Sequence, residues 1–394
     1  MRSMFITACL LSVCIACSRS DTNNNTPQAL PALSTGNLTQ VRSSNSTTTF
    51  HFAIDVYPVS SKDISVNYMT KDSTAISGVD YTAVSGTLTI PAEQLSGYIE
   101  VVVTADSLRQ NDQIFVLKLS SPINATLSTS QVTGTIQNLG TYLPIDSTGY
   151  TSASSYPGMT LVWSDEFNGK TLNAGNWTYE TGGGGWGNSE LEYYTNSYKN
   201  TFLTGGYLVI EARKETIGSN NYTSARIKTE DKKTFTYGRI DMRAKLPYGQ
   251  GLWPALWMLG NDISQSGFGW PVCGEIDIME LLGQNPRTIY GSYHWENQGT
   301  EGNASQGYSL SSGSFSDNFH VFSLQWDSAK MAILVDDVAY STINKSDVTG
   351  SSYPFDKPFF FIFNVAVGGN WPGSPNSSTT FPQRMIVDYV RVFQ

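Results

Sequence analysis

The sequence predicts an all-β protein made of two β-sandwich domains, a smaller one followed by a larger one. Three observations support this fold class. Charged residues are 14% of the 394 residues, against about a quarter in an average soluble protein. Short alternating or continuous apolar stretches, separated by turn residues, recur along the chain. No segment has the apolar stripe at helical spacing that marks an amphipathic helix.

The smaller sandwich is predicted at residues 31–139. A chain of 394 residues exceeds a typical single domain and suggests two. Strand-like stretches lie at 48–56, 64–69, 86–90, 98–103, 114–119 and 132–136. About seven short strands in roughly 110 residues are typical of an Ig-like β-sandwich.

The larger sandwich is predicted at residues 158–394, after a linker at 140–157 rich in Ser, Thr, Pro and Gly. At 239–246, Ile240 and Met242 share one face of a strand and Arg239 and Asp241 the other. Residues 320–326 and 331–335 predict a hairpin, and 359–367 is almost continuously apolar, as an inner strand would be. Together they indicate a two-sheet sandwich.

The N-terminal residues predict export. Residues 1–17 combine Arg2 with an apolar run that is too short to span a bilayer. Cys17 ends this run and resembles the lipidated cysteine of a bacterial lipoprotein, with cleavage without lipidation as the alternative. A polar tether at 18–30 follows. We therefore expect an outer-membrane or cell-surface lipoprotein, or a periplasmic or secreted protein, which touches a membrane only through Cys17.

Composition limits the partners. The formal net charge is −9 without a long basic run, which argues against nucleic acid as a partner. The 9 Trp and 21 Tyr suit a ligand with flat apolar faces, such as a sugar, although core packing would account for many of them. Only Cys273 follows the export segment, so no intrachain disulfide is expected after cleavage. We expect a monomer.

Three carboxylates stand close together in the segment 274–281, GEIDIMEL. Glu275 and Asp277 are two apart and share one face of a strand. Plain alternation would point Glu280 into the core, which is costly for an ionised group. A β-bulge around 278–279 would return Glu280 to the face of the other two. The spacing therefore predicts a bulged strand with three carboxylates on one face.

Crowded carboxylates cannot all ionise cheaply, so at least one pKa is raised. An acid that keeps its proton beside an ionised partner is what glycoside hydrolysis needs. The alternatives are a solvated acidic strand or a calcium site. Nearby Trp253, Trp257 and Trp270 argue against the first, and calcium usually takes ligands spread over a loop.

The carboxylate strand resembles that of glycoside hydrolase family 16, more narrowly its laminarinase and endo-β-1,3(4)-glucanase branch. The resemblance rests on EIDIME, on TYGRIDMRAKLPYGQGLWPALWML before it, and on DEFNG, GWGNSELEYYT, SARIKT, GSYHW and VDYVRVF in order. It covers nearly all of 158–394 and implies a concanavalin-like jelly roll. It also implies that the enzyme retains anomeric configuration, with Glu275 as nucleophile, Glu280 as general acid/base and Asp277 between them, and that no cofactor takes part in catalysis.

The same resemblance implies a set of sugar-binding residues, each with an ordinary structural alternative such as core packing or a surface ion pair. The expected set is Trp186, Asn188, Glu190, Arg226, Trp253, Trp257, Trp270, His294, Asn364 and Trp371. Many relatives also carry a structural calcium, for which Glu166 and Asp388 match the side-chain positions.

The smaller domain resembles a Calx-beta domain, through VNYMTKDSTAISGVDY at 66–81 and the later GTLTIP and FVLKLSSP. Some relatives bind calcium with loop acids. Asp80, Asp106 and Asp112 are present, but Gln113 stands where another acid is expected, so we expect an accessory or spacer module.

The function predicted from the sequence is endo-hydrolysis of β-1,3-glucan, together with mixed-linkage β-1,3-1,4-glucan. One alternative is another family 16 activity, of the agarase or porphyranase kind. The other is a non-catalytic glucan-binding surface protein, against which the three retained carboxylates argue.

Overall fold

The computed structural model describes residues 29–350 and 352–394. The predicted export segment with Cys17, and the tether as far as residue 28, lie outside the described residues. The described helices are two single turns of 3-10 helix, η1 (Lys345–Asp347) and η2 (Pro354–Asp356), while strands account for about half of the described residues. Neither helix is long and apolar enough to cross a membrane. The predicted all-β class is confirmed.

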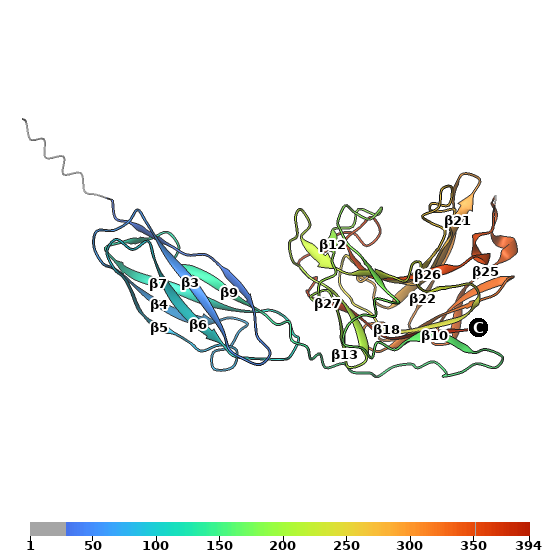
Figure 1. The fold of residues 1–394 in the computed structure, drawn as a ribbon, viewed down its shortest axis with the longest axis horizontal. Helices are drawn as coiled ribbons and strands as arrows, with labels where there is room; N and C mark the ends of the chain where they lie inside the picture. Colours follow the sequence, from blue (N-terminus) through green and yellow to red (C-terminus); the bar gives the residue numbers. More distant parts are fainter. Residues whose placement is uncertain (1–28, 351) are drawn as a thin grey trace, which may run out of the picture.

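The first body is a small two-sheet sandwich at one end of the molecule (Figure 1). One sheet has the order β6-β3-β1-β8 and the other β2-β9-β7-β4-β5. Their strands are β1 (Ala32–Ser34), β2 (Leu38–Val41), β3 (Thr48–Tyr57), β4 (Ile64–Asp72), β5 (Ser85–Ile90), β6 (Ser96–Val103), β7 (Gln113–Ile123), β8 (Thr126–Leu127) and β9 (Gln131–Gln137). Phe50, Phe52, Phe115 and Tyr81 fill the space between the sheets. Each predicted strand lies within an observed one, and the observed strands extend up to four residues beyond a predicted bound.

The second body is a larger sandwich of two eight-stranded sheets. One sheet has the order β13-β14-β27-β18-β23-β24-β25, with β10 beside β27. Its strands are β10 (Leu161–Asp165), β13 (Thr201–Thr204), β14 (Tyr207–Ala212), β18 (Gly238–Lys245), β23 (His320–Trp326), β24 (Lys330–Val335), β25 (Val338–Asn344) and β27 (Gln383–Phe393). It is called the outer sheet below.

The other sheet, called the site sheet below, has the order β11-β16-β26-β19-β20-β21-β22, with β17 beside β26. Its strands are β11 (Thr178–Glu180), β16 (Arg226–Lys228), β17 (Thr234–Phe235), β19 (Leu252–Gly260), β20 (Glu275–Leu281), β21 (Thr288–Asn297), β22 (Thr300–Ser309) and β26 (Phe359–Val367). A short parallel pair, β12 (Glu192–Tyr194) with β15 (Tyr222–Ser224), lies apart from both sheets. One continuous apolar core joins the two sheets, with Met242, Ile276 and Phe363 among its fully buried members.

The predicted two-residue alternation of β18 is observed, but its polar face is not solvated. Arg239, Asp241 and Arg243 are all buried. The linker covers them: Tyr156 donates a hydrogen bond to Asp241 at 2.7 Å, and the Arg243 guanidinium donates to the carbonyl oxygen of Tyr150. The predicted linker is therefore a segment packed on the outer sheet.

The two bodies lie end to end in Figure 1 and are joined by an ion-pair cluster. Arg109 of the first body is 3% exposed. Its Nε and Nη2 donate to Glu211 of β14 at 3.0 and 3.1 Å, and Nη2 also donates to the Lys199 carbonyl at 2.7 Å. Arg213 and Arg384 of the second body contact the same carboxylate. Three guanidinium groups thus surround one fully buried carboxylate at the domain junction.

Candidate active site

Strand β20 carries the three carboxylates, and the predicted bulge in it is confirmed. The pairing of β20 with β21 shifts register between Asp277 and Glu280. On the other side, β19 pairs with Met279 and then with Asp277, so that Ile278 is skipped. Ile278 and Met279 are both fully buried in the core. The extra residue turns Glu280 back to the face that carries Glu275 and Asp277, and all three line one cleft.

Burial and mutual repulsion raise the pKa of each carboxyl in this cluster. Burial, and then the neighbouring Asp277, raise the pKa of Glu275 to about 8. Burial, and then Glu275, raise the pKa of Glu280 to about 7. The pKa of the deeply buried Asp277 is raised well above its ordinary value for the same two reasons, with Glu280 as the neighbour. The cluster therefore retains protons near neutral pH and titrates as a unit.

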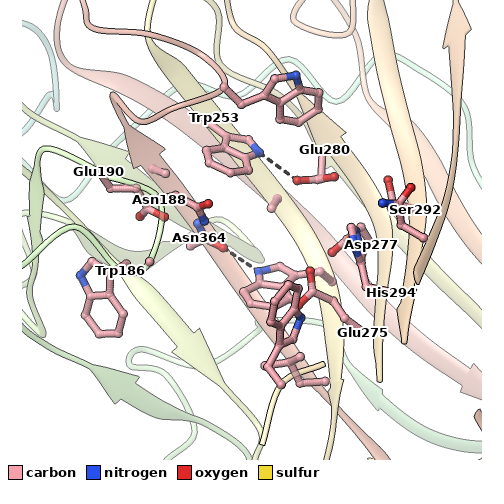
Figure 2. A pocket seen from close by; sticks show the side chains of 18 of the residues that line it. Trp186, Asn188, Glu190, Trp253, Glu275, Asp277, Glu280, Ser292, His294 and Asn364 are labelled. Carbon is pink, nitrogen blue, oxygen red and sulfur yellow. Dashed lines mark hydrogen bonds and ion pairs between the residues drawn. The ribbon is translucent and has the colours of Figure 1, made fainter. Parts of the chain in front are cut away.

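A histidine from the adjacent strand β21 lies against these carboxylates. His294 Nε2 is 3.1 Å from Asp277 Oδ2, and His294 Nδ1 is 2.6 Å from Glu301 Oε1 on β22. The Trp270 ring lies beside the imidazole, with 6.3 Å between ring centroids. Figure 2 shows His294, Asp277 and Glu275 gathered on one wall of the cleft.

A tryptophan from β19 contacts the expected general acid. Trp253 Nε1 donates a hydrogen bond to Glu280 Oε1 at 3.0 Å (Figure 2). Trp371 packs edge-on against Trp253 and also against Tyr290, with ring centroids 5.5 and 5.0 Å apart. Trp371 is 41% exposed, so part of its ring remains available to a ligand.

The far end of the cleft combines aromatic rings with one cation. Arg226 lies over both Trp186 and Trp257, with 5.1 and 4.8 Å from its guanidinium carbon to the ring centroids. Its ion pair is with Glu180 of the neighbouring strand, rather than with Glu190. Trp257 Nε1 donates to Asn364 Oδ1 at 2.7 Å. These contacts fix two flat rings at the cleft wall, a geometry that suits sugar faces.

A second acidic pair supports this end. Asn364 donates to the Tyr194 hydroxyl, which donates to Glu190, at 3.1 Å each. Glu192 is fully buried and accepts the Val367 amide hydrogen at 2.6 Å. Burial, and then the adjacent Glu190, raise the pKa of Glu192 well above its ordinary value. The bond from Val367 to Glu192 therefore ties strand β12, close to Glu190, to strand β26.

All thirteen residues expected to act on the sugar line the same cleft, which has a volume of about 690 Å³. Those residues are Glu275, Asp277, Glu280, Trp186, Asn188, Glu190, Arg226, Trp253, Trp257, Trp270, His294, Asn364 and Trp371.

The motifs in the sequence did not reveal a polar wall formed by Ser292, Glu301, Asn303 and Ser305. The last three alternate along β22. Because β22 has almost no apolar residues, the alternation of its polar side chains was the only local signal.

The predicted calcium positions are occupied by arginine in this structure. Arg391 pairs with both carboxylate oxygens of Glu166, and Arg243 with Asp388 at 2.6 Å. A guanidinium on each carboxylate does not fit a calcium site, which needs free oxygen ligands. The calcium therefore stays a prediction that these contacts do not favour.

The acidic loops of the first body are also occupied by arginine. Arg42 pairs with Asp80 at 2.8 Å and with Asp106 at 3.3 Å. Gln113 donates to Asp80 at 2.9 Å, and Asp112 pairs with Arg213 across the domain junction. These loops therefore stabilise the module and its junction without a free carboxylate cluster.

Glu275 and Glu280 project from one bulged strand into a tryptophan-lined cleft, an arrangement that suits a glycoside hydrolase. The comparisons give the family: the chain belongs to the glycosyl hydrolases family 16, whose sequence model matches residues 189–391. The Calx-beta domain model matches residues 37–139. The resemblances to family 16 and to the Calx-beta domain are thereby confirmed.

Several relatives are known. A beta-glucanase of Rhodothermus marinus is 41% identical over 246 residues, which cover 60% of this chain and 86% of the relative. Glucan endo-1,3-beta-glucosidase A1 of Niallia circulans is 40% identical, over 60% of this chain and 38% of that protein. The laminarinase catalytic domain of Thermotoga maritima superposes with a TM-score of 0.56 at 47% identity, covering 60% of this chain and 98% of that one.

Proposed function

We propose that the protein is a retaining endo-β-glucanase that hydrolyses β-1,3-glucan and also mixed-linkage β-1,3-1,4-glucan. One observation carries the proposal: the bulge in β20 places Glu275 and Glu280 on one face of a single strand, within one cleft. The beta-glucanase, endo-1,3-beta-glucosidase and laminarinase relatives support the substrate class.

In the first step, Glu280 gives its proton to the glycosidic oxygen while ionised Glu275 attacks the anomeric carbon. The bond to the leaving sugar breaks and a glycosyl ester forms on Glu275. Ionised Glu280 then takes a proton from water, whose oxygen attacks the same carbon and releases Glu275. The pKa of Glu280 near 7, raised by burial and by Glu275, suits a group that alternates between acid and base. The pKa of Glu275 in the empty cleft is higher, at about 8, so the roles of the two residues rest on the family resemblance and not on the order of these pKa values.

Asp277 lies between the two reacting carboxyls in the sequence and contacts His294 in space. Its raised pKa keeps a proton beside Glu275, because burial disfavours another negative charge there. A charged His294 ring and the Trp270 indole N–H favour ionised Glu275.

The test is a digest of laminarin, barley β-glucan, agarose and xyloglucan, with the products sized. We expect oligosaccharides from laminarin and from barley β-glucan. Products from agarose alone would favour the agarase-like alternative. Binding to laminarin without any release of sugar would favour a non-catalytic glucan-binding protein.

We also propose that the protein is exported and anchored through Cys17, and that it acts as a monomer. The apolar run that ends at Cys17 supports the anchor. Mass analysis of the mature N-terminus tests it: a lipid mass on Cys17 supports the anchor, and an unmodified N-terminus contradicts it. Light scattering of the purified protein tests the monomer.

A further inference from the structure

The cleft wall formed by His294 and its neighbours places one nitrogen donor and two oxygen donors close together. Glu275, Asp277 and His294 each offer an atom, and these atoms all lie within 4.8 Å of one another. Figure 2 shows the three side chains converging. Two carboxylate oxygens with one imidazole nitrogen are a common donor set for zinc and related divalent ions.

Two further observations point to a ligand at this position. Asp277 is 3% exposed, and its Oδ2 has no hydrogen-bond partner among the described residues although it faces His294 Nε2. His294 Nδ1 lies 2.6 Å from Glu301 Oε1. A hydrogen bond from Nδ1 to Glu301 leaves the Nε2 lone pair directed at Asp277. A carboxylate behind a histidine is the usual support of a metal-binding imidazole.

The geometry needs little adjustment to hold an ion. Ligands about 2.0–2.2 Å from a tetrahedral zinc ion lie roughly 3.4 Å from one another. His294 Nε2 and Asp277 Oδ2 are already 3.1 Å apart. The Glu275 oxygen lies no more than 4.8 Å from either of these atoms, so it would have to move by roughly 1.4 Å or less. All three side chains line the cleft, from which a water molecule would complete the coordination.

We propose that Glu275, Asp277 and His294 form an inhibitory binding site for zinc-class divalent ions, with Glu301 as the residue that positions His294. The inference rests on the proposed function, because the ion would engage the nucleophile Glu275. An ion bound there competes with the sugar for the same carboxylate. Magnesium and calcium, which prefer all-oxygen sites, bind weakly.

The test measures binding directly, by calorimetric titration of the full two-domain protein with zinc chloride and by the visible spectrum of the cobalt(II) form. We expect one ion per chain, displaced by a laminari-oligosaccharide. E301Q weakens zinc binding about 10- to 100-fold, as expected for loss of the support behind the histidine, and H294Q abolishes it. At a zinc concentration ten times its dissociation constant, hydrolysis at low substrate slows roughly elevenfold.

Two control variants test whether the three donor side chains, rather than other groups near the cleft, hold the ion. N303A alters β22, the strand of Glu301, and the same cleft wall, but it removes no donor atom. Its zinc affinity should therefore equal that of the unaltered protein. C273A removes the buried thiol two residues before Glu275 and should also leave the affinity unchanged. E301Q provides the test if H294Q fails to fold.

Unchanged zinc affinity in both H294Q and E301Q would overturn the site, as would the absence of zinc binding or a zinc isotherm indifferent to a bound oligosaccharide. An oligosaccharide that fails to bind even without zinc would instead contradict the proposed function. The zinc isotherms of the variants would then still decide the metal site.

Discussion

The hydrogen bond from Trp253 to Glu280 gives a quantitative test of how the acid is tuned. The Nε1–Oε1 distance is 3.0 Å, and this bond lowers the pKa of Glu280 against the larger effects of burial and of Glu275. A hydrogen bond to a charged group contributes about 1.5–3 kcal/mol, and one pKa unit corresponds to about 1.4 kcal/mol. Because Glu280 keeps some solvent contact, the lower figure of about 1.5 kcal/mol applies. It corresponds to a pKa shift of about one unit.

The variant W253F keeps an aromatic ring for the sugar but removes the donor. Ionised Glu280 then loses a partner, its pKa rises, and the acid stays protonated to higher pH. The alkaline limb of the pH profile of kcat/KM should therefore move upward by up to about one pH unit. One unit is the upper limit because Glu280 and Glu275 titrate together. W371F, which alters a ring in contact with Trp253 but no bond to Glu280, should leave the limb in place. A limb that stays or moves downward in W253F would refute the reasoning.

Three other outcomes are expected. E275Q should abolish turnover while laminarin binding, measured by calorimetry, remains; full activity would contradict the nucleophile. R109M should lower the free energy of unfolding in urea by about 1–3 kcal/mol. The loss is limited because Glu211 keeps its ion pairs with two other arginines. An unchanged midpoint would show that the bond from Arg109 to Glu211 does not stabilise the junction. Burial alone would raise the pKa of Glu211, but the arginines lower it, so its contribution is present at neutral pH and is lost as pH falls through its folded pKa. EDTA should leave the Tm unchanged if arginine rather than calcium pairs with Glu166 and Asp388. A fall in Tm would support the predicted calcium site.

The parts predicted well from the sequence are those governed by local pattern. Apolar alternation located the strands, because its period of two is visible within six or seven residues. The bulge followed from parity alone, because an unbulged strand would have buried Glu280. Most cleft residues stand in motifs that the family resemblance identifies, and the fold brings them together.

The parts that were missed depend on long-range pairing of polar groups. Glu301 lies on a strand without an apolar face, so no periodicity marked it as a strand residue. Arg109 meets Glu211 across 102 positions of sequence, and nothing near either residue indicates the contact. The alternation of β18 did not show that its charged face is buried, because only the folded chain places the linker over Asp241.

The bulge in β20 also has an evolutionary consequence. Deletion of the single codon for Met279 would leave Glu-Ile-Asp-Ile-Glu, in which plain alternation places all three acids on one face. A regular strand and a bulged strand that differ by one residue can thus present the same catalytic side chains. The bulged form has the additional apolar side chain of Met279 in the core. A short insertion or deletion at this point could therefore be inherited without passing through an inactive enzyme.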